Sequence, residues 1–316
     1  MSPNSWTCLH PSNATEAKLS LDNRGLAYGD GFFTTMGVID GQILWFDYHQ
    51  QRLVSHATAL QLQLDSQLLL AMLKIHAKQL QQGMLKLIIT RAEQEVRGYG
   101  YTPNIGGGSA CEIWLKSSPM AITTARSLPL ADGQFIPLQP AASAICLSSQ
   151  IACLPPTLAG LKSLNRLDNV LASGELQAIK AKTLAGTIKP SIAEGLLRDI
   201  SGHWVEGTMS NVFYQLVEAP VAKSSNRPHS QNNSSNYLTQ GQWYTPSMAQ
   251  SGVAGVMRQV IIDTLSTSNN PVIIRSLQDE DLPHLSQLFF CNALRGIMPM
   301  SSLRLLSGEV VSFEAI

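Results

Sequence analysis

The sequence predicts a mixed α/β or α+β fold made of two domains. Strand-like and helix-like segments alternate irregularly in both halves of the chain, which favours this class over a single doubly wound sheet. No G-x-G-x-x-G motif follows a strand-like run, so dinucleotide binding has no support. The length of 316 residues is sufficient for two cores. We place the boundary near Pro119 and Pro129, giving an N-terminal domain of residues 1–122 and a C-terminal domain of residues 123–316.

In the first half, the segment GQILWFDYHQQRL (41–53) passes from strand-like β-branched and aromatic residues into a helical pattern. The short apolar runs 84–92 and 111–118 predict two buried strands. Glycines and a proline between these runs predict a loop.

In the second half, AICLSSQIACL (144–154) predicts a strand. Leucines recur at helical spacing through 161–174, which predicts a helix with a core-facing stripe and with Lys162 at its start. Residues 191–216 predict two strands joined by an Asp-to-Gly turn, and LFFCNA (288–293) predicts a strand followed by a loop. The polar, Ser/Asn-rich stretch at about 220–240 predicts an exposed insertion.

The composition excludes several classes of partner. Lysine plus arginine equals aspartate plus glutamate at 22 each, so no basic field is available for nucleic acid or an anionic membrane. The five cysteines form no C-x-x-C pair and the histidines show no metal-binding spacing, so we expect no disulfide framework and no metal site. The N-terminal residues lack a basic segment followed by an apolar run. We therefore expect neither a signal peptide nor a membrane span, and a cytoplasmic location.

Four features of the chain carry chemistry when they are taken together. Taken singly, each feature has an ordinary structural explanation. Lys162 would lay its stem on apolar surface, and Arg52 would be a solvated helix arginine. Glu206 would be a turn residue, and the glycines of 252–259 would only interrupt the regular structure. Together they match the needs of pyridoxal 5′-phosphate. Its aldehyde forms a Schiff base with a lysine, and its pyridine nitrogen needs a carboxylate. Its phosphate suits a helix N-terminus and a guanidinium.

Six motifs then resemble those of one family, the fold-type IV pyridoxal-phosphate enzymes. In chain order they are RGLAYGDGFFTT (24–35), HQQRL (49–53), LKSLNRLDNVLASGE (161–175), VEGTMSNVFY (205–214), GVAGVMRQ (252–259) and CNALRGIMP (291–299). The resemblance implies a class IV aminotransferase-like fold, with the cofactor in a cleft between two domains, and a homodimer.

The resemblance also implies roles for single residues. Lys162 matches the Schiff-base lysine and Glu206 the partner of the pyridine nitrogen. The remaining matches to cofactor-binding positions are Arg52, Val256, Met257, Asn211, Asn292 and Ala293. Ala293 stands where the family often has a threonine, so that phosphate contact must come from the backbone or from Asn292.

Within the family, KSLNRLDNVL, RGYG and CNALRGIMP look more like the aminodeoxychorismate lyases than the transaminases. Those enzymes convert 4-amino-4-deoxychorismate into pyruvate and 4-aminobenzoate, a precursor of folate. The likeness implies that Lys162 removes the proton at C4 of the substrate ring. We expect Arg97 and Arg166 to bind the two substrate carboxylates, and Thr35 to position the leaving pyruvate or its proton donor.

Two alternatives stay open. A branched-chain or D-amino-acid transaminase would use the same Lys162 and Glu206. Phe33 and Thr34 replace the tyrosine and glutamate of the D-amino-acid transaminases, and no histidine follows Arg97 in the pattern that they use. A non-catalytic protein that keeps the fold for binding is the other alternative, and the presence of both Lys162 and Glu206 argues against it.

Overall fold

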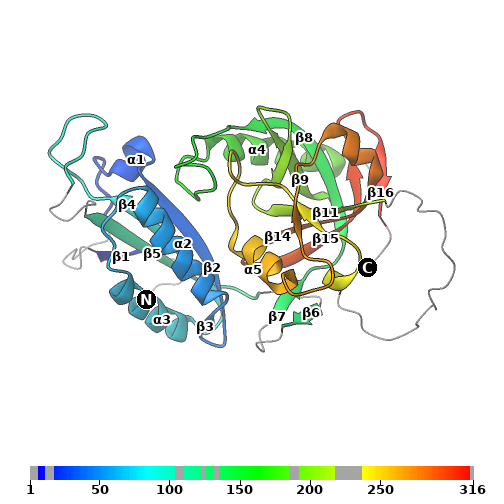
Figure 1. The fold of residues 1–316 in the computed structure, drawn as a ribbon. Coiled ribbons are helices and arrows are strands. Elements are labelled where there is room, and N and C mark those ends of the chain that lie inside the picture. The colour runs from blue at the N-terminus through cyan, green and yellow to red at the C-terminus, as the bar shows by residue number, and fades with distance from the viewer. Residues whose placement is uncertain are drawn as a thin grey trace.

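The computed structural model describes residues 6–10, 18–103, 110–122, 126–130, 135–184, 192–217 and 237–313. The chain forms two β-sheets side by side, one from each half, and helices α2 and α5 meet where the two halves face each other (Figure 1). Within the described residues, no helix is long and apolar enough to span a bilayer.

The first half contains a five-stranded antiparallel sheet with the order β1-β5-β4-β2-β3. Its elements are β1 (Trp6–His10), α1 (Arg24–Tyr28), β2 (Gly31–Ile39), β3 (Gln42–Ile43), α2 (Phe46–Ala59), α3 (Ser66–Leu80), β4 (Gly83–Arg91) and β5 (Cys111–Pro119). The strands predicted at 84–92 and 111–118 are confirmed as β4 and β5.

Strand β4 shows how this sheet acquires two different faces. Leu85, Leu87 and Ile89 are buried in a cluster with leucines of α2 and α3, so both helices cover that face. Because side chains alternate along a strand, Met84 and Lys86 lie on the opposite face. That opposite face is directed toward the second half of the chain, where both residues line a cavity.

The second half contains an eleven-stranded sheet. Its elements are β6 (Arg126–Pro129), β7 (Phe135–Leu138), β8 (Ala142–Ile151), α4 (Leu167–Leu184), β9 (Ile192–Asp199), β10 (Trp204–Gly207), β11 (Asn211–Leu216), η1 (Tyr237–Thr239), β12 (Tyr244–Thr245), α5 (Val256–Leu265), β13 (Ile273–Ile274), η2 (Asp279–His284), β14 (Leu285–Asn292), β15 (Gly296–Arg304) and β16 (Val310–Ser312).

Six of these strands pair in a closed ring, in the order β8-β9-β10-β11-β14-β15 and back to β8. One buried cluster takes side chains from all six, such as Val212 and Phe290, and fills the inside of the ring. Phe213 and Phe289, one position along, stack at 4.9 Å between ring centroids on the outside, where α5 packs. The described residues of this half therefore form three buried clusters, one inside the ring, one beneath α5 and one beneath α4.

Two sequence predictions about the second half need correction or refinement. The segment 191–216 holds three strands, β9, β10 and β11, because the short loop 208–210 divides the second predicted strand. The loop predicted after LFFCNA is a tight turn, and β15 follows at once. The two-domain fold is confirmed, and the first sheet ends at Pro119 while the second begins at Arg126. The boundary at 122–123 stays a prediction, and most of the predicted insertion at 220–240 lies outside the described residues.

Candidate active site

One cavity of about 580 Å³ lies between the two halves of the chain. Strands β2 and β4 and helix α2 line it from the N-terminal half. The C-terminal half contributes the segments 162–173, 206–211, 253–256 and 291–294. Residues far apart in the sequence therefore meet at the expected interdomain position.

Lys162 reaches this cavity from an extended segment rather than from a helix. Helix α4 begins at Leu167, so the prediction that Lys162 starts the helix is wrong. The N–H of Phe33 on β2 donates to the Lys162 carbonyl at 3.0 Å, and Ser163 forms an isolated bridge with Phe32. This pairing with β2 keeps the segment extended. The Lys162 Nζ atom lies 4.6 Å from the centre of the Phe33 ring.

The predicted core-facing stripe is also wrong. Leu161 is buried, but Leu167 is 71 % exposed and Leu171 is 64 % exposed. The first turns of α4 therefore present apolar side chains outward beside the cavity, where Val170 lies at its edge.

Burial lowers the pKa of Lys162 to about 7. The positive charges of Arg52, Arg166 and Lys86 act in the same direction, and the negative charge of Glu206 opposes them. At neutral pH a large fraction of the amines is unprotonated, which is the state of a nucleophile and of a base.

Glu206 is the one carboxylate among the described residues that line the cavity. It lies one residue before the end of strand β10 and is 2 % exposed. Its Oε2 atom accepts from the N–H of Val253 at 2.8 Å, and its Oε1 atom accepts from the side chain of Asn169 at 3.3 Å. Burial raises the pKa of this carboxyl, while these hydrogen bonds and the charges of Arg166 and Lys162 act against that rise.

The loop 252–255 leads into α5 and is fixed on several sides. Asn211 donates to the Val253 carbonyl at 2.8 Å. A Cβ atom added at Gly255 would lie 1.9 Å from Asn211 Oδ1, so only glycine fits there without a shift. Gly255 is the N-cap of α5 and has no side chain to cap the helix. The first N–H groups of α5, at Val256 and Met257, therefore suit an anion in the cavity.

Arg52 on α2 lies 7 % exposed against the same loop. Its Nη2 group donates to the Ala254 carbonyl at 2.7 Å, and burial lowers its pKa to about 10. Met257 is fully buried, so its contribution to a ligand is limited to its backbone. Arg52 and the α5 N-terminus together fit a phosphate group, whose oxygens would accept from both.

Asn292, Ala293 and Thr35 also line the cavity. The Asn292 Oδ1 atom accepts from the N–H groups of Leu294 and Arg295, at 3.1 and 2.8 Å, and so organises the turn after β14. Thr35 lies on β2 directly opposite Lys86 on β4. The hydroxyl of the neighbouring Thr34 faces away from the cavity and lies 2.9 Å from His49 Nδ1.

The cavity carries an excess of positive charge. Arg52, Lys86, Arg166 and the partly protonated Lys162 line it, and Glu206 is the one carboxylate that the described part of the chain sets against them. Arg166 donates through Nη2 to the Leu161 carbonyl, and its buried Nε has no hydrogen-bond partner among the described residues. The sequence reasoning missed Lys86, although a charged residue inside the apolar run MLKLIIT was a usable signal.

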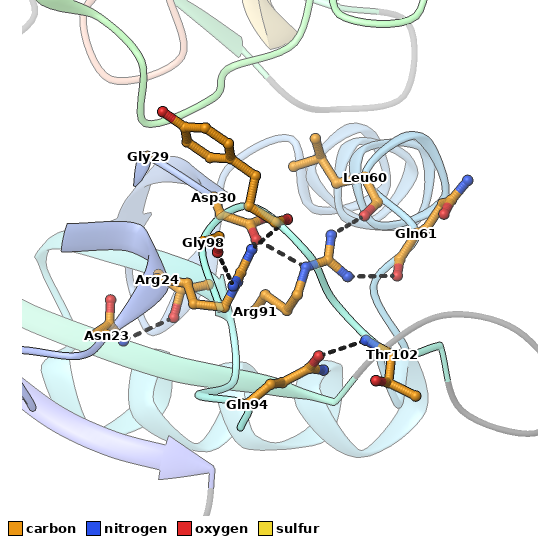
Figure 2. A network of polar contacts seen from close by, with 12 residues as sticks. Asn23, Arg24, Gly29, Asp30, Leu60, Gln61, Arg91, Gln94, Gly98 and Thr102 are labelled. Atoms are coloured by element: carbon orange, nitrogen blue, oxygen red, sulfur yellow. Dashed lines mark hydrogen bonds and ion pairs between the residues drawn. The ribbon is translucent and has the colours of Figure 1, made fainter. Parts of the chain in front are cut away.

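Arg97 is not among the described residues that line this cavity. It lies exposed in the loop between β4 and β5. The next residues are fixed by Arg24, which donates to the carbonyl of Gly98 at 3.4 Å (Figure 2) and to the carbonyl of Tyr99 at 3.2 Å. Asp30 accepts from both Arg24 and Arg91 at 2.9 Å (Figure 2). The loop that carries Arg97 is thus anchored to the N-terminal half, and Arg97 does not reach the cavity of its own chain.

The chain belongs to the amino-transferase class IV family, whose model matches residues 31–303. Members of this family bind pyridoxal 5′-phosphate, and the donors described above fit that group: a lysine amine, a buried carboxylate, and a guanidinium beside a glycine-capped helix N-terminus.

The names of the individual relatives point to two activities, that of an aminodeoxychorismate lyase and that of an aminotransferase. The chain is 24 % identical to an aminodeoxychorismate lyase of Vibrio harveyi over 91 % of this chain and 88 % of the relative. The solved 4-amino-4-deoxychorismate lyase of Pseudomonas aeruginosa is 29 % identical, with a TM-score of 0.69, and the match covers 94 % of this chain and 90 % of that one. A putative branched-chain-amino-acid aminotransferase of Methanocaldococcus jannaschii is 25 % identical over 95 % and 87 % of the two chains.

Proposed function

We propose that this protein is a pyridoxal-phosphate-dependent aminodeoxychorismate lyase. In this reaction 4-amino-4-deoxychorismate loses pyruvate and becomes 4-aminobenzoate. The observation that carries the proposal is the charge of the cavity, where, among the described residues, Arg52, Lys86 and Arg166 and the partly protonated Lys162 face one carboxylate. A phosphate group and a substrate with two carboxylates together supply the negative charge that this cavity lacks.

The cofactor would be held at three places. Lys162 would bind its aldehyde carbon, Glu206 would hold the proton on its pyridine nitrogen, and Arg52 with the N-terminus of α5 would bind its phosphate. Asn211 acts indirectly, because it fixes the loop before α5 through the Val253 carbonyl. When bound, pyridoxal phosphate supplies an electron sink for the bond that breaks at the substrate.

The chain's own groups then move one proton and orient one leaving group. The Lys162 amine, with its pKa near 7, takes the proton from C4 of the substrate ring. The electrons of that C–H bond make the ring aromatic, and the bond between the ring and the enolpyruvyl oxygen breaks. The leaving enolpyruvate takes up a proton and becomes pyruvate. Thr35 lines the cavity on β2 and would position that leaving group or its proton donor.

The two carboxylates of the substrate need cations that the cofactor does not use. Arg166 has an unpartnered buried Nε, and Lys86 forms no ion pair among the described residues. We assign these two residues to the substrate carboxylates. The sequence also predicts Arg97 as a ligand of a substrate carboxylate. Arg97 does not line the cavity of its own chain, so it could bind the substrate only in the cavity of another subunit.

A homodimer and a cytoplasmic location remain part of the proposal. The outward-facing Leu167, Val170 and Leu171 form an apolar strip beside the cavity that a second subunit would cover. A gel-filtration mass equal to one chain would contradict the dimer.

A product assay tests the proposed reaction. The purified protein with pyridoxal phosphate is given 4-amino-4-deoxychorismate, generated in place by its synthase, and 4-aminobenzoate and pyruvate are measured. A parallel reaction contains branched-chain or D-amino acids with a 2-oxo acid, because one relative is named as a branched-chain aminotransferase. We expect equal amounts of 4-aminobenzoate and pyruvate and no amino transfer. Amino transfer without 4-aminobenzoate would establish the transaminase instead.

A further inference from the structure

His56 lies behind Lys162 and contacts its main chain. It is one helical turn after Arg52 on α2 and is 5 % exposed. The Lys162 N–H donates to His56 Nε2 at 2.9 Å. The ring also packs edge-on against Phe32, with 5.4 Å between ring centroids. His56 thus contacts two chain segments that meet at the candidate active site.

The hydrogen bonds determine where the proton of this imidazole lies. A main-chain N–H can only donate, so Nε2 accepts and the neutral ring carries its proton on Nδ1. Nδ1 lies 3.3 Å from the Ser55 hydroxyl, which itself donates to the Arg52 carbonyl at 3.2 Å. A continuous series of hydrogen bonds therefore runs from Lys162 through His56 and Ser55 to the main chain of Arg52.

The surroundings keep the ring neutral. Burial lowers the pKa of His56 to about 3, and the positive charges of Arg52, Arg166 and Lys162 act in the same direction. A protonated ring would have no lone pair for the Lys162 N–H. The acceptor at Nε2 is consequently present at neutral pH.

We propose that His56 is a positioning residue that fixes the Lys162 main chain relative to Arg52 on α2. This inference rests on the roles of Lys162 and Arg52 in the proposed function. The two backbone groups of Lys162 are then bound from opposite sides, the N–H by His56 and the carbonyl by the N–H of Phe33. With its main chain fixed twice, the side chain has few ways to place its amine, which is the requirement for a reactive group in a cavity.

Two amide substitutions separate positioning from simple packing. The amide of His56→Gln reaches the place of Nε2 and supplies an acceptor, whereas the shorter amide of His56→Asn reaches only the place of Nδ1. Both are polar and smaller than histidine, so both remove the ring. His76→Asn on α3 is the control for the loss of a helical histidine away from the cavity.

The first readout uses the protein without cofactor. Trace acetylation of Lys162, followed by peptide mass spectrometry from pH 6 to 10, reports the pH at which the amine becomes reactive. The second readout is the affinity for pyridoxal phosphate, measured by fluorescence. We expect His56→Asn to move the reactivity of Lys162 to higher pH and to weaken cofactor binding roughly ten-fold, the cost of about one hydrogen bond. His56→Gln should retain most of both properties.

Equal behaviour of His56→Asn and wild type in both readouts would overturn the inference. Equal losses in His56→Asn and His56→Gln would overturn it as well, because packing alone would then explain the effect. Neither readout depends on the reaction that the enzyme catalyses. A wild-type protein without lyase activity would therefore reject the proposed function and leave the role of His56 to be judged by these measurements.

Discussion

Replacing Lys162 by methionine should change how the stability of the cofactor-free protein depends on pH. Methionine has a similar length but carries no amine, so a buried charge is removed from a cavity that contains three other cations. The pKa of the amine is about 7 in the folded protein, against 10.5 as its ordinary value. Between these two pH values the unfolded chain binds a proton that the folded chain lacks.

The sign and size of the effect follow from this difference. Stability rises with pH wherever the unfolded state binds more protons, by about 1.4 kcal/mol per pH unit for one proton. The free energy of unfolding of the wild type, relative to Lys162→Met, should therefore increase by about 2.5 kcal/mol between pH 7 and pH 9. Below pH 7 the difference between the two proteins should level off, because both states of the wild type then bind the proton.

Urea unfolding at a series of pH values measures this difference. Lys78→Met, which removes an exposed lysine from α3, controls for the loss of a positive charge. Parallel pH curves for the wild type and Lys162→Met would refute the argument, because they would show that Lys162 binds its proton equally well in the folded and unfolded chains.

Three further predictions concern two residues of the cavity, Glu206 and Gly255, and the Arg24 network. Glu206→Gln removes the negative charge that raises the pKa of Lys162, so that pKa should fall below its value of about 7; acetylation against pH measures it, and a rise would contradict the assignment. Gly255→Ala should weaken pyridoxal-phosphate binding at least about ten-fold in a fluorescence titration, because its Cβ has no space. Gly174→Ala, which has open space on α4, should bind the cofactor as the wild type does. Away from the cavity, Arg24→Ala should lower the free energy of unfolding by about 1–3 kcal/mol, since it removes one of the two donors to half-buried Asp30 and the hydrogen bonds to two carbonyls; an unchanged urea midpoint would contradict this.

The sequence predicted those parts of the site that local signals determine. Glu206 lies beside a glycine at the end of a strand, and the glycines of 252–255 precede a helix, so both could be located from the residue types alone. Arg52 belongs to a regular amphipathic helix. The structure brings all three to one cavity together with Lys162. Their roles toward the cofactor stay predictions.

The errors arise where contacts distant in sequence override a local pattern. Leucine spacing indicated a helix from residue 161, but hydrogen bonds to β2 hold the segment before Leu167 extended. The same spacing predicts a core-facing stripe, but Leu167 and Leu171 face outward. A surface that another subunit would cover has the same apolar periodicity as a core face, so one sequence cannot separate the two.

The sequence analysis does not single out His56 or Lys86, for two different reasons. His56 contacts Lys162 across 106 positions in the chain, and nothing local marks it as different from the other histidines. Lys86 could have been found, because a lysine inside a buried strand must face a polar space or an anion. The charge of the cavity thus arises because the two halves pack together, and it cannot be seen in the sequence of either half alone.

Borohydride reduction of the protein with bound pyridoxal phosphate, followed by peptide mapping, tests the central assignment most directly. We predict a single phosphopyridoxyl group on the peptide that contains Lys162, and none in Lys162→Met. Attachment to Lys86 or another lysine, or a reducible chromophore that persists in Lys162→Met, would contradict the account.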